Sequence, residues 1–329
     1  MEVRGSLPEN APLCLMISKT FHFIVGFERQ FSPFPLAHFL CLSSCLQVNN
    51  PDRIIVHYGV EPWGPYWERI RPQVDLRHVS PDSLVNTFRY SDLSIAKYRY
   101  AHLSDFARLE ILNEYGGVYA DIDTLFVRPI PPELFDKPCV MGRERVDETR
   151  PEAVWRGSLC NALIMAHPES AFCVRWLQQM PQAFDGSWSR HATFLPYLLS
   201  QQFSDEIHLE PESSFFKLDW TREGIADLFE RARTDLHDVY SLHLWSHLWW
   251  ERSRTDVTRF HSGRVTPAYV RHASSSFAEL SRNFLPADLP GSYWDLRSQE
   301  LFDWFGTTLA AGSAKFMRAV RGRTSAVGI

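Results

Sequence analysis

The sequence predicts an α/β fold with a central sheet flanked by helices. Between residues 15 and 128, short runs of β-branched and aromatic residues alternate with longer periodic apolar runs, which is typical of strand-helix-strand units. The chain has 329 residues and is 45% hydrophobic, so it can bury a full core. Its net charge of -5 gives no general basic field and argues against nucleic acid as a partner.

Three strands are predicted before residue 80. Each is a short run of β-forming residues bounded by turn residues. They are residues 21–26, 53–59 and 74–79. A helix is predicted between the first two, at 36–49, because Pro33 and Pro35 precede this apolar run and Asn50-Pro51 follows it.

The segment from 101 to 127 contains the most informative local pattern. Residues 101–115 are apolar on nearly all sides, which predicts a buried helix that ends at Gly116-Gly117. Residues 118–127 are rich in β-forming residues, and the tight connection after the helix leads the chain into a central strand of the sheet. Asp121 and Asp123 would then lie at or just beyond its end, where open α/β sheets bind ligands.

After residue 130 the alternation becomes looser. We predict two further strand-like segments and two further helices. The strands are at 159–167 and 241–250, and the helices are at 168–180 and 298–306.

The cysteine pattern and the N-terminus bear on the compartment. The six cysteines include no CxxC pair, so we expect reduced core residues. The apolar stretch at 13–27 is interrupted by Lys19 and His22 and is too short to span a bilayer. We therefore expect a cytoplasmic protein without a signal anchor.

Asp121 and Asp123 need a positive partner. On an extended strand, residues two apart share a face, so the carboxylates would lie about 6–7 Å apart. Their repulsion would be about 2–3 kcal/mol at an effective dielectric near 20. A nearby arginine could offset it, as could Mg²⁺ or Mn²⁺ with a phosphate-bearing ligand. The alternative is a solvated turn with two exposed aspartates.

The stretch "AHLSDFARLEILNEYGGVYADIDTLFVRPI", residues 101–130, resembles the sugar-binding DXD region of glycosyltransferase family 32. That family includes initiating α-1,6-mannosyltransferases, and it is close to α-1,4-galactosyltransferases and toxin-type glucosyltransferases. The resemblance is dense over residues 17–130 and touches 157–170 and 240–250. It implies a GT-A type, Rossmann-like central sheet with a mixed α+β acceptor side.

The resemblance also implies a division of the chain. One glycosyltransferase domain would cover 1–285, with a nucleotide-sugar half at about 15–130 and an acceptor half at about 131–285. A helical, basic C-terminal segment would follow at 286–329. Its cations include Lys315 and Arg318 beside Phe316 and Met317, so it is either a contact to a membrane surface or a solvated terminus.

Seven residues receive roles from the resemblance. Asp121, Asp123 and Arg108 are the expected catalytic residues, with Asp121, Asp123 and His243 as metal ligands and Asp105, Arg108, Asp121, Asn161, His243 and Phe23 as donor-binding residues. Each has an ordinary alternative. Asp105 and Arg108, three apart on a helix, could simply pair with each other, Asn161 could satisfy backbone groups, and His243 could be a core histidine.

The function implied is a metal-dependent glycosyltransferase. It would move a sugar from a UDP-sugar or GDP-mannose to a saccharide or glycolipid acceptor in polysaccharide biosynthesis, with Mn²⁺ or Mg²⁺ and with retention of configuration. Two alternatives stay open. One is a catalytically silent nucleotide-sugar-binding protein on the same fold. The other is a haloacid-dehalogenase-type phosphatase, although Thr124 comes one position too early for that motif.

Overall fold

The computed structural model describes residues 16–28, 30–80, 99–149, 151–301 and 303. The chain divides into two compact units. The first comprises Met1–Gly224 and Thr234–Trp245, and the second comprises Ile225–Arg233 and Ser246–Ile329. All seven residues that the resemblance singles out belong to the first unit.

The first unit is built on a seven-stranded sheet with the order β3-β2-β1-β4-β7-β6-β8. The strands are β1 (Thr20–Val25), β2 (Arg53–Tyr58), β3 (Asp75–His78), β4 (Gly117–Ala120), β6 (Cys139–Arg143), β7 (Leu159–Ala166) and β8 (His208–Glu210). Strands β3, β2, β1 and β4 run parallel, while β7 is antiparallel to both β4 and β6. The predicted α/β fold with a central sheet is therefore confirmed, and β4 occupies its middle.

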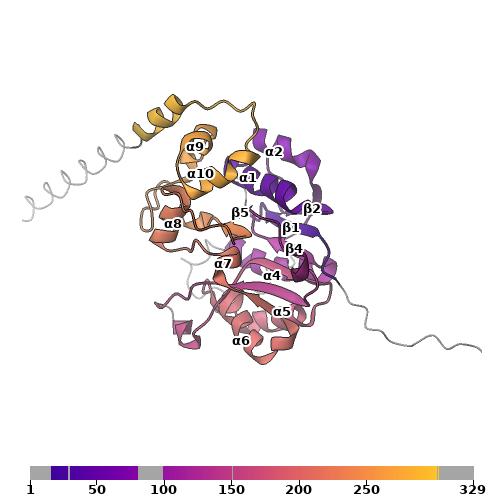
Figure 1. Cartoon of the computed structure of the whole chain (residues 1–329). Helices are drawn as coiled ribbons and strands as arrows, with labels where there is room; N and C mark the ends of the chain where they lie inside the picture. The colour runs from indigo at the N-terminus through magenta and orange to yellow at the C-terminus, as the bar shows by residue number, and fades with distance from the viewer. Residues whose placement is uncertain (1–15, 29, 81–98, 150, 302, 304–329) are drawn as a thin grey trace, which may run out of the picture. The chain divides into compact units, whose positions relative to one another are not determined.

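Helices cover both faces of this sheet. Figure 1 shows α1 and α2 on the opposite side of β1 and β4 from α4, α5 and α6. The α-helices of this unit are α1 (Leu36–Ser44), α2 (Pro65–Ile70), α4 (Arg99–Tyr115), α5 (Ala171–Ala183), α6 (Leu195–Gln202) and α7 (Glu212–Phe215). Its short 3-10 and π helices are Arg71–Gln73, Pro132–Leu134, Pro151–Trp155, Ser204–Glu206, Cys45–Asn49 and Arg190–Phe194.

Most of the predicted helices are confirmed, with shifted ends. The segment 36–49 is helical throughout, but its last five residues, Cys45–Asn49, form a π-helix. The helix predicted at 168–180 begins at Ala171, because Glu169 has a positive φ of 54° and Ser170 N donates to His167 O at 3.2 Å. Because of this turn, the helix begins three residues later than predicted.

The double glycine after α4 is required by its surroundings. Gly116 and Gly117 have φ angles of +60° and +101°, which side chains other than glycine rarely adopt. A Cβ on Gly117 would lie 2.3 Å from the carbonyl oxygen of Thr20. The two glycines therefore allow a buried helix to lead directly into the central strand β4.

Residues 118–127 do not form one continuous strand, although Asp121 and Asp123 do follow the end of the central strand β4, as predicted. The chain leaves the large sheet after β4, and residues 124–126 form a separate strand, β5 (Thr124–Phe126), which pairs antiparallel with β9 (Ser241–His243). A turn separates β4 from β5, because Thr124 N donates to the carbonyl oxygen of Asp121 at 3.0 Å. Asp121 and Asp123 thus lie on a turn rather than on one strand face.

The strand predicted at 241–250 is also too long. Residues 241–243 form β9, whereas Ser246–Leu248 form a 3-10 helix. Trp245 separates them with a φ of +53°, a left-handed conformation that ends an extended strand.

The second unit is helical and has an aromatic core. Its α-helices include α9 (Pro267–His272) and α10 (Ser276–Ser281), with 3-10 turns at Ser246–Leu248, Ser262–Arg264 and Arg282–Phe284, and α8 (Arg222–Phe229) enters it at Ile225. Phe229 stacks on Phe260 with ring centroids 4.4 Å apart. Residues 293–301 are helical, five residues earlier than predicted. The basic segment from 304 onward lies outside the described residues.

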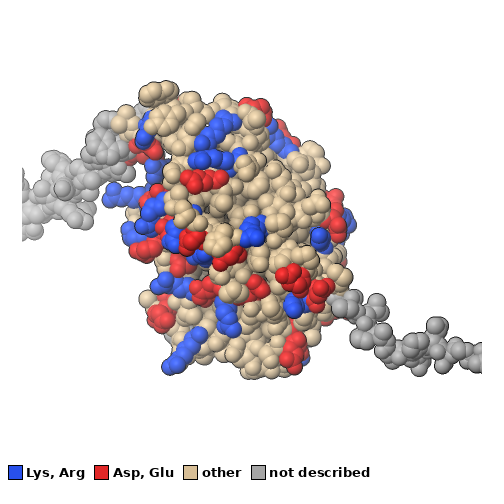
Figure 2. Space-filling view, viewed as in Figure 1, with Lys and Arg blue, Asp and Glu red and all other residues tan. Residues whose placement is uncertain are grey.

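The structure bears on the predictions about cysteines, membrane spans and surface charge. Five cysteines, at positions 41, 45, 139, 160 and 173, are buried and unbridged, while Cys14 lies outside the described residues. Across the described ranges, every helix is too short or too polar to cross a membrane. On the face drawn in Figure 2, basic and acidic side chains are interspersed.

Two neighbouring parallel strands of the sheet, β1 and β2, carry a buried pair of histidines. His22 on β1 and His57 on β2 are both fully buried, with Nδ1 of His22 3.0 Å from Nε2 of His57. Nε2 of His22 lies 2.9 Å from the carbonyl oxygen of Gly116. Since that nitrogen must donate, Nδ1 of His22 accepts from His57. Burial lowers the pKa of His22 to about 4 and that of His57 to about 3.

This pair predicts acid sensitivity of the fold. Unfolded histidines bind protons below about pH 6.5, whereas the folded pair resists protonation until about pH 4. Stability is therefore complete above pH 6.5 and falls on acidification, by up to about 2 kcal/mol per ring at pH 5. Urea unfolding at pH 7.5 and pH 5 should show a smaller loss for His57→Gln than for the wild type. Equal losses would contradict this assignment.

Candidate active site

The site is built where β4 ends in the middle of the sheet. Asp121 N donates to the carbonyl oxygen of Ala162 on β7 at 2.8 Å, and the carbonyl oxygen of Asp123 accepts from Leu244 N at 2.9 Å. The β5–β9 ladder places His243 directly opposite Thr124, the neighbour of Asp123. The turn is thus held by the central sheet on one side and by β9 on the other.

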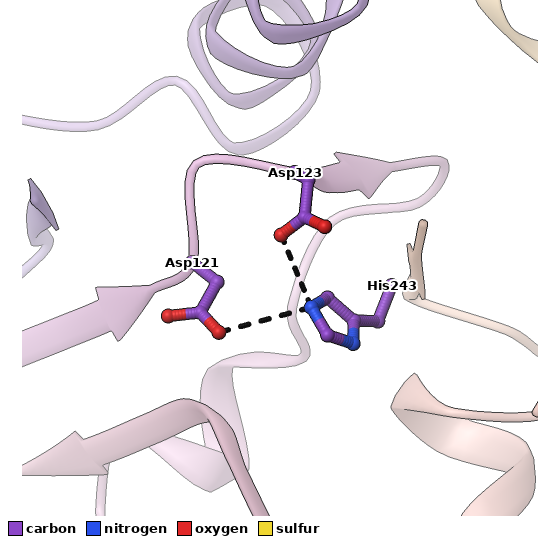
Figure 3. A group of neighbouring side chains, drawn as sticks. All are labelled: Asp121, Asp123 and His243. Atoms are coloured by element: carbon purple, nitrogen blue, oxygen red, sulfur yellow. Dashed lines mark hydrogen bonds and ion pairs between the residues drawn. The ribbon is translucent and has the colours of Figure 1, made fainter. Parts of the chain in front are cut away.

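Asp121, Asp123 and His243 converge on one point. Nε2 of His243 lies 3.1 Å from Oδ1 of Asp123 and 3.7 Å from Oδ2 of Asp121. Figure 3 shows both carboxylates directed at this ring nitrogen. One ligand atom from each residue lies within 4.8 Å of the other two. The side chains of Asp123 and His243 are each 7% exposed and that of Asp121 is 26% exposed.

Arg108 supplies the cation that the paired aspartates require. Its Nη2 lies 3.4 Å from Oδ1 of Asp121 and 3.1 Å from Oδ1 of Asp105. Its guanidinium also lies over the ring of Tyr119, 4.7 Å from the centroid. Tyr119 itself donates to Oδ1 of Asp121 at 2.6 Å. Asp121 is therefore fixed by a charge and a hydroxyl behind the turn.

Asp105 belongs to a second, deeper group of contacts. Its Oδ1 accepts from Nδ2 of Asn161 at 2.7 Å, and its Oδ2 lies 3.0 Å from Nε2 of His191. Nη1 of Arg108 donates to the carbonyl oxygen of Asn161 at 2.6 Å. Helix α4, strand β7 and the π-helix Arg190–Phe194 thus meet at this carboxylate.

The electrostatic environment differs among these groups. Burial raises the pKa of Asp121, and Arg108 and His243 oppose that rise. For Asp105, burial is outweighed by Arg108 and His191, and its pKa is lowered. Burial also acts on His243, but the carboxylates of Asp123 and Asp121 raise its pKa overall. The cluster is therefore held together by opposite charges inside the protein.

The structure brings six of the seven predicted residues together. They are Asp105, Arg108, Asp121, Asp123, Asn161 and His243. The pairing of Asp105 with Arg108 is present, but it is one part of a larger cluster. Phe23 is fully buried in β1, so its side chain offers no surface to a donor, and its binding role stays a prediction.

Sequence reasoning missed three residues near this cluster. Tyr119 stands two positions before Asp121, a spacing that places both on one face of a strand and could have identified it. His191 is 86 residues from Asp105 and carries no motif. Glu144 follows β6 and accepts from Ser158 Oγ at 2.6 Å. Its pKa is raised by burial, and it lies within electrostatic range of His243.

Trp245 stabilises the position of His243. Its ring centroid lies 4.2 Å from that of His243, and its Nε1 donates to the carbonyl oxygen of Leu218 at 2.9 Å. Its positive φ is the strained feature of this segment, and such strain is commonly stored at functional sites.

The comparison with protein families identifies this region. Residues 70–141 match the family model described as a glycosyltransferase sugar-binding region containing a DXD motif. This range includes Asp105, Arg108, Asp121 and Asp123. It is a DXD-type glycosyltransferase region. The resemblance inferred from the sequence is confirmed, and the matched family is not a phosphatase family.

Similarity to known proteins extends beyond the matched region. The chain is 27% identical over 278 residues to glucan organizing enzyme 1 of Cryptococcus neoformans, covering 82% of this chain and 71% of the relative. Similar solved structures include PaToxG glycosyltransferase, with a TM-score of 0.41, 19% identity and coverage of 57% of this chain and 71% of that one. An active-site variant of LgtC gives a TM-score of 0.42 with 14% identity, covering 82% and 98%.

Proposed function

We propose that the protein is a metal-dependent glycosyltransferase that moves a sugar from a nucleotide-sugar donor to a saccharide or glycolipid acceptor. The observation that carries this proposal is the convergence of Asp121, Asp123 and His243 at the end of β4. The two aspartates lie within the matched DXD region, and His243 lies outside it in the sequence. Carboxyl ends of central strands are where α/β sheets bind their ligands.

The donor atoms of this triad fit a divalent cation. Two carboxylate oxygens suit Mn²⁺ and Mg²⁺ equally, but the imidazole nitrogen of His243 favours Mn²⁺, because Mg²⁺ prefers oxygen ligands. Asp121, Asp123 and His243 would hold the ion. When bound, Mn²⁺ would supply Lewis-acid neutralisation of charge on a departing diphosphate, an effect worth several kcal/mol.

The surrounding residues prepare the two carboxylates for this role. Arg108 is 4% exposed, so its charge acts on Asp121 from inside the protein and opposes the rise in the pKa of that carboxyl that burial causes. Tyr119 fixes the orientation of the same carboxylate by donating to its Oδ1. We assign Arg108 and Tyr119 to holding Asp121, and Asp123 and His243 to the more deeply buried side of the ion.

Finer features of the reaction follow the family resemblance. We infer retention of configuration, a UDP-sugar or GDP-mannose as the donor, and a role in building polysaccharide. The name of the fungal relative, glucan organizing enzyme 1, refers to a polysaccharide and agrees with a saccharide acceptor.

The test is release of nucleoside diphosphate from a panel of UDP- and GDP-sugars, with mixed oligosaccharide acceptors, in the presence of Mn²⁺, Mg²⁺ or EDTA. The proposal expects release from at least one donor with Mn²⁺ and none with EDTA. Metal-dependent binding of a nucleotide-sugar without turnover would instead support a silent binding protein. Release that EDTA leaves unchanged would refute the metal role.

A further inference from the structure

His191 is a buried histidine that the proposed reaction does not otherwise use. It is fully buried in the π-helix Arg190–Phe194, and its Nε2 lies 3.0 Å from Oδ2 of Asp105. Since a carboxylate oxygen accepts, Nε2 carries the proton and donates to Asp105. Its Nδ1 has no hydrogen-bond partner among the described residues. Among the described residues, Asp105 is therefore the hydrogen-bond partner of this ring.

The two oxygens of Asp105 are held by different groups. Oδ1 receives Nδ2 of Asn161 at 2.7 Å and Nη2 of Arg108 at 3.1 Å, while Oδ2 faces His191. The Asp105 side chain is 9% exposed. All of these contacts come from inside the protein, and His191 is the group that holds Oδ2.

Arg108 connects Asp105 to the proposed metal site. The same Nη2 of Arg108 that faces Asp105 also faces Oδ1 of Asp121 at 3.4 Å. This guanidinium is also held by the backbone carbonyl oxygens of Ser104 and Asn161, at 3.1 and 2.6 Å, and by the ring of Tyr119. A carboxylate free to rotate at Asp105 would release one of the anchors that keep Arg108 against Asp121.

The surroundings of His191 keep its ring in one orientation. Phe106 stacks on it with centroids 6.0 Å apart, and Phe184 meets it edge-on at 4.9 Å. Trp176 Nε1 donates to the backbone carbonyl oxygen of His191 at 2.9 Å and anchors the π-helix itself. An aromatic enclosure of this kind fixes the direction of the single N–H that reaches Asp105.

We propose that His191 is a positioning residue for sugar transfer, which acts through Asp105 and Arg108 to hold Asp121 in place. This assignment rests on the proposed glycosyltransferase function. His191 touches neither the donor nor the ion in this scheme. Its contribution is the hydrogen bond that prevents Asp105 from turning away from Arg108.

The test compares His191→Leu, which removes the donor, with His191→Gln, whose amide can still donate. With the donor that the wild type turns over, His191→Leu should lower kcat/KM about 10- to 100-fold, as loss of a charge-assisted hydrogen bond does. His191→Gln should recover most of this loss, and the exposed His237→Leu should match the wild type. In an Asp105→Ala background, His191→Leu should cause no further loss.

Three results would overturn the assignment. They are unchanged kcat/KM in His191→Leu, no rescue by His191→Gln, and an equal loss from His191→Leu with and without Asp105. A wild type inactive toward every donor would instead refute the proposed function. NMR of ¹⁵N-histidine-labelled protein tests the contact without turnover: one ring N–H signal, lost in His191→Gln, should move upfield in Asp105→Ala. A signal unaffected by Asp105→Ala would show that His191 does not donate to it.

Discussion

Asp123→Ala is expected to abolish metal-dependent release of nucleoside diphosphate, with a fall in rate of at least about 1,000-fold. The carboxylate of Asp123 is one of three groups that converge on the proposed ion, and its Oδ1 also lies 3.1 Å from Nε2 of His243. Removing it takes away a ligand and frees the imidazole at the same time. The two remaining donors would bind a divalent cation far more weakly, so excess Mn²⁺ should restore little activity.

The measurement needs a matched aspartate and a direct reading of the metal. Asp205, an exposed residue of the 3-10 helix Ser204–Glu206, supplies the control, because Asp205→Ala removes one carboxylate at a different part of the fold. Electron paramagnetic resonance of Mn²⁺ should show weaker binding in Asp123→Ala and unchanged binding in Asp205→Ala. Full Mn²⁺ affinity in Asp123→Ala would rule out the ion site.

Much of the sheet and one part of the site could be predicted from local sequence. Strands β1, β2 and β3 were readable because each is a short β-forming run between turn residues. The double glycine and the paired aspartates were readable because both act through residues adjacent in the chain. The break between β4 and β5 could not be predicted in this way. Residues Thr124–Phe126, which follow the break, are as β-forming as the residues before it.

The break in that strand comes from contacts that no local pattern contains. Residues 124–126 pair with β9, more than 110 residues further along the chain, instead of with the large sheet. The same holds for His191, whose partner Asp105 is 86 residues away. His243 was named through the resemblance rather than through spacing. Sequence thus located the acidic turn, while its partners depended on tertiary contacts.

Arg108→Met should be among the most destabilising single changes in the first unit, with a loss of about 3–5 kcal/mol in the free energy of unfolding. Methionine fills a similar volume, so the loss comes from charge rather than from a cavity. Asp105 and Asp121 would keep their buried positions without the guanidinium that lies 3.1 and 3.4 Å from them. Urea unfolding at pH 7.5 measures the change, and Arg53→Met, which breaks the exposed pair with Asp75, should cost at most about 1 kcal/mol.

The pH dependence of this loss separates an electrostatic cause from poor packing. In the wild type the pKa of Asp105 is lowered, with Arg108 the leading cause that opposes burial. Without Arg108, burial would raise the pKa of Asp105, and the pKa of Asp121, which already lies above its ordinary value, would rise further. The folded variant would then take up protons that the unfolded chain does not. Its stability would then be regained as the pH falls toward 4, and the gap to the wild type would narrow. A gap that stays constant between pH 7.5 and pH 4.5 would mean that Arg108 acts through packing, and that Asp121 does not depend on its charge.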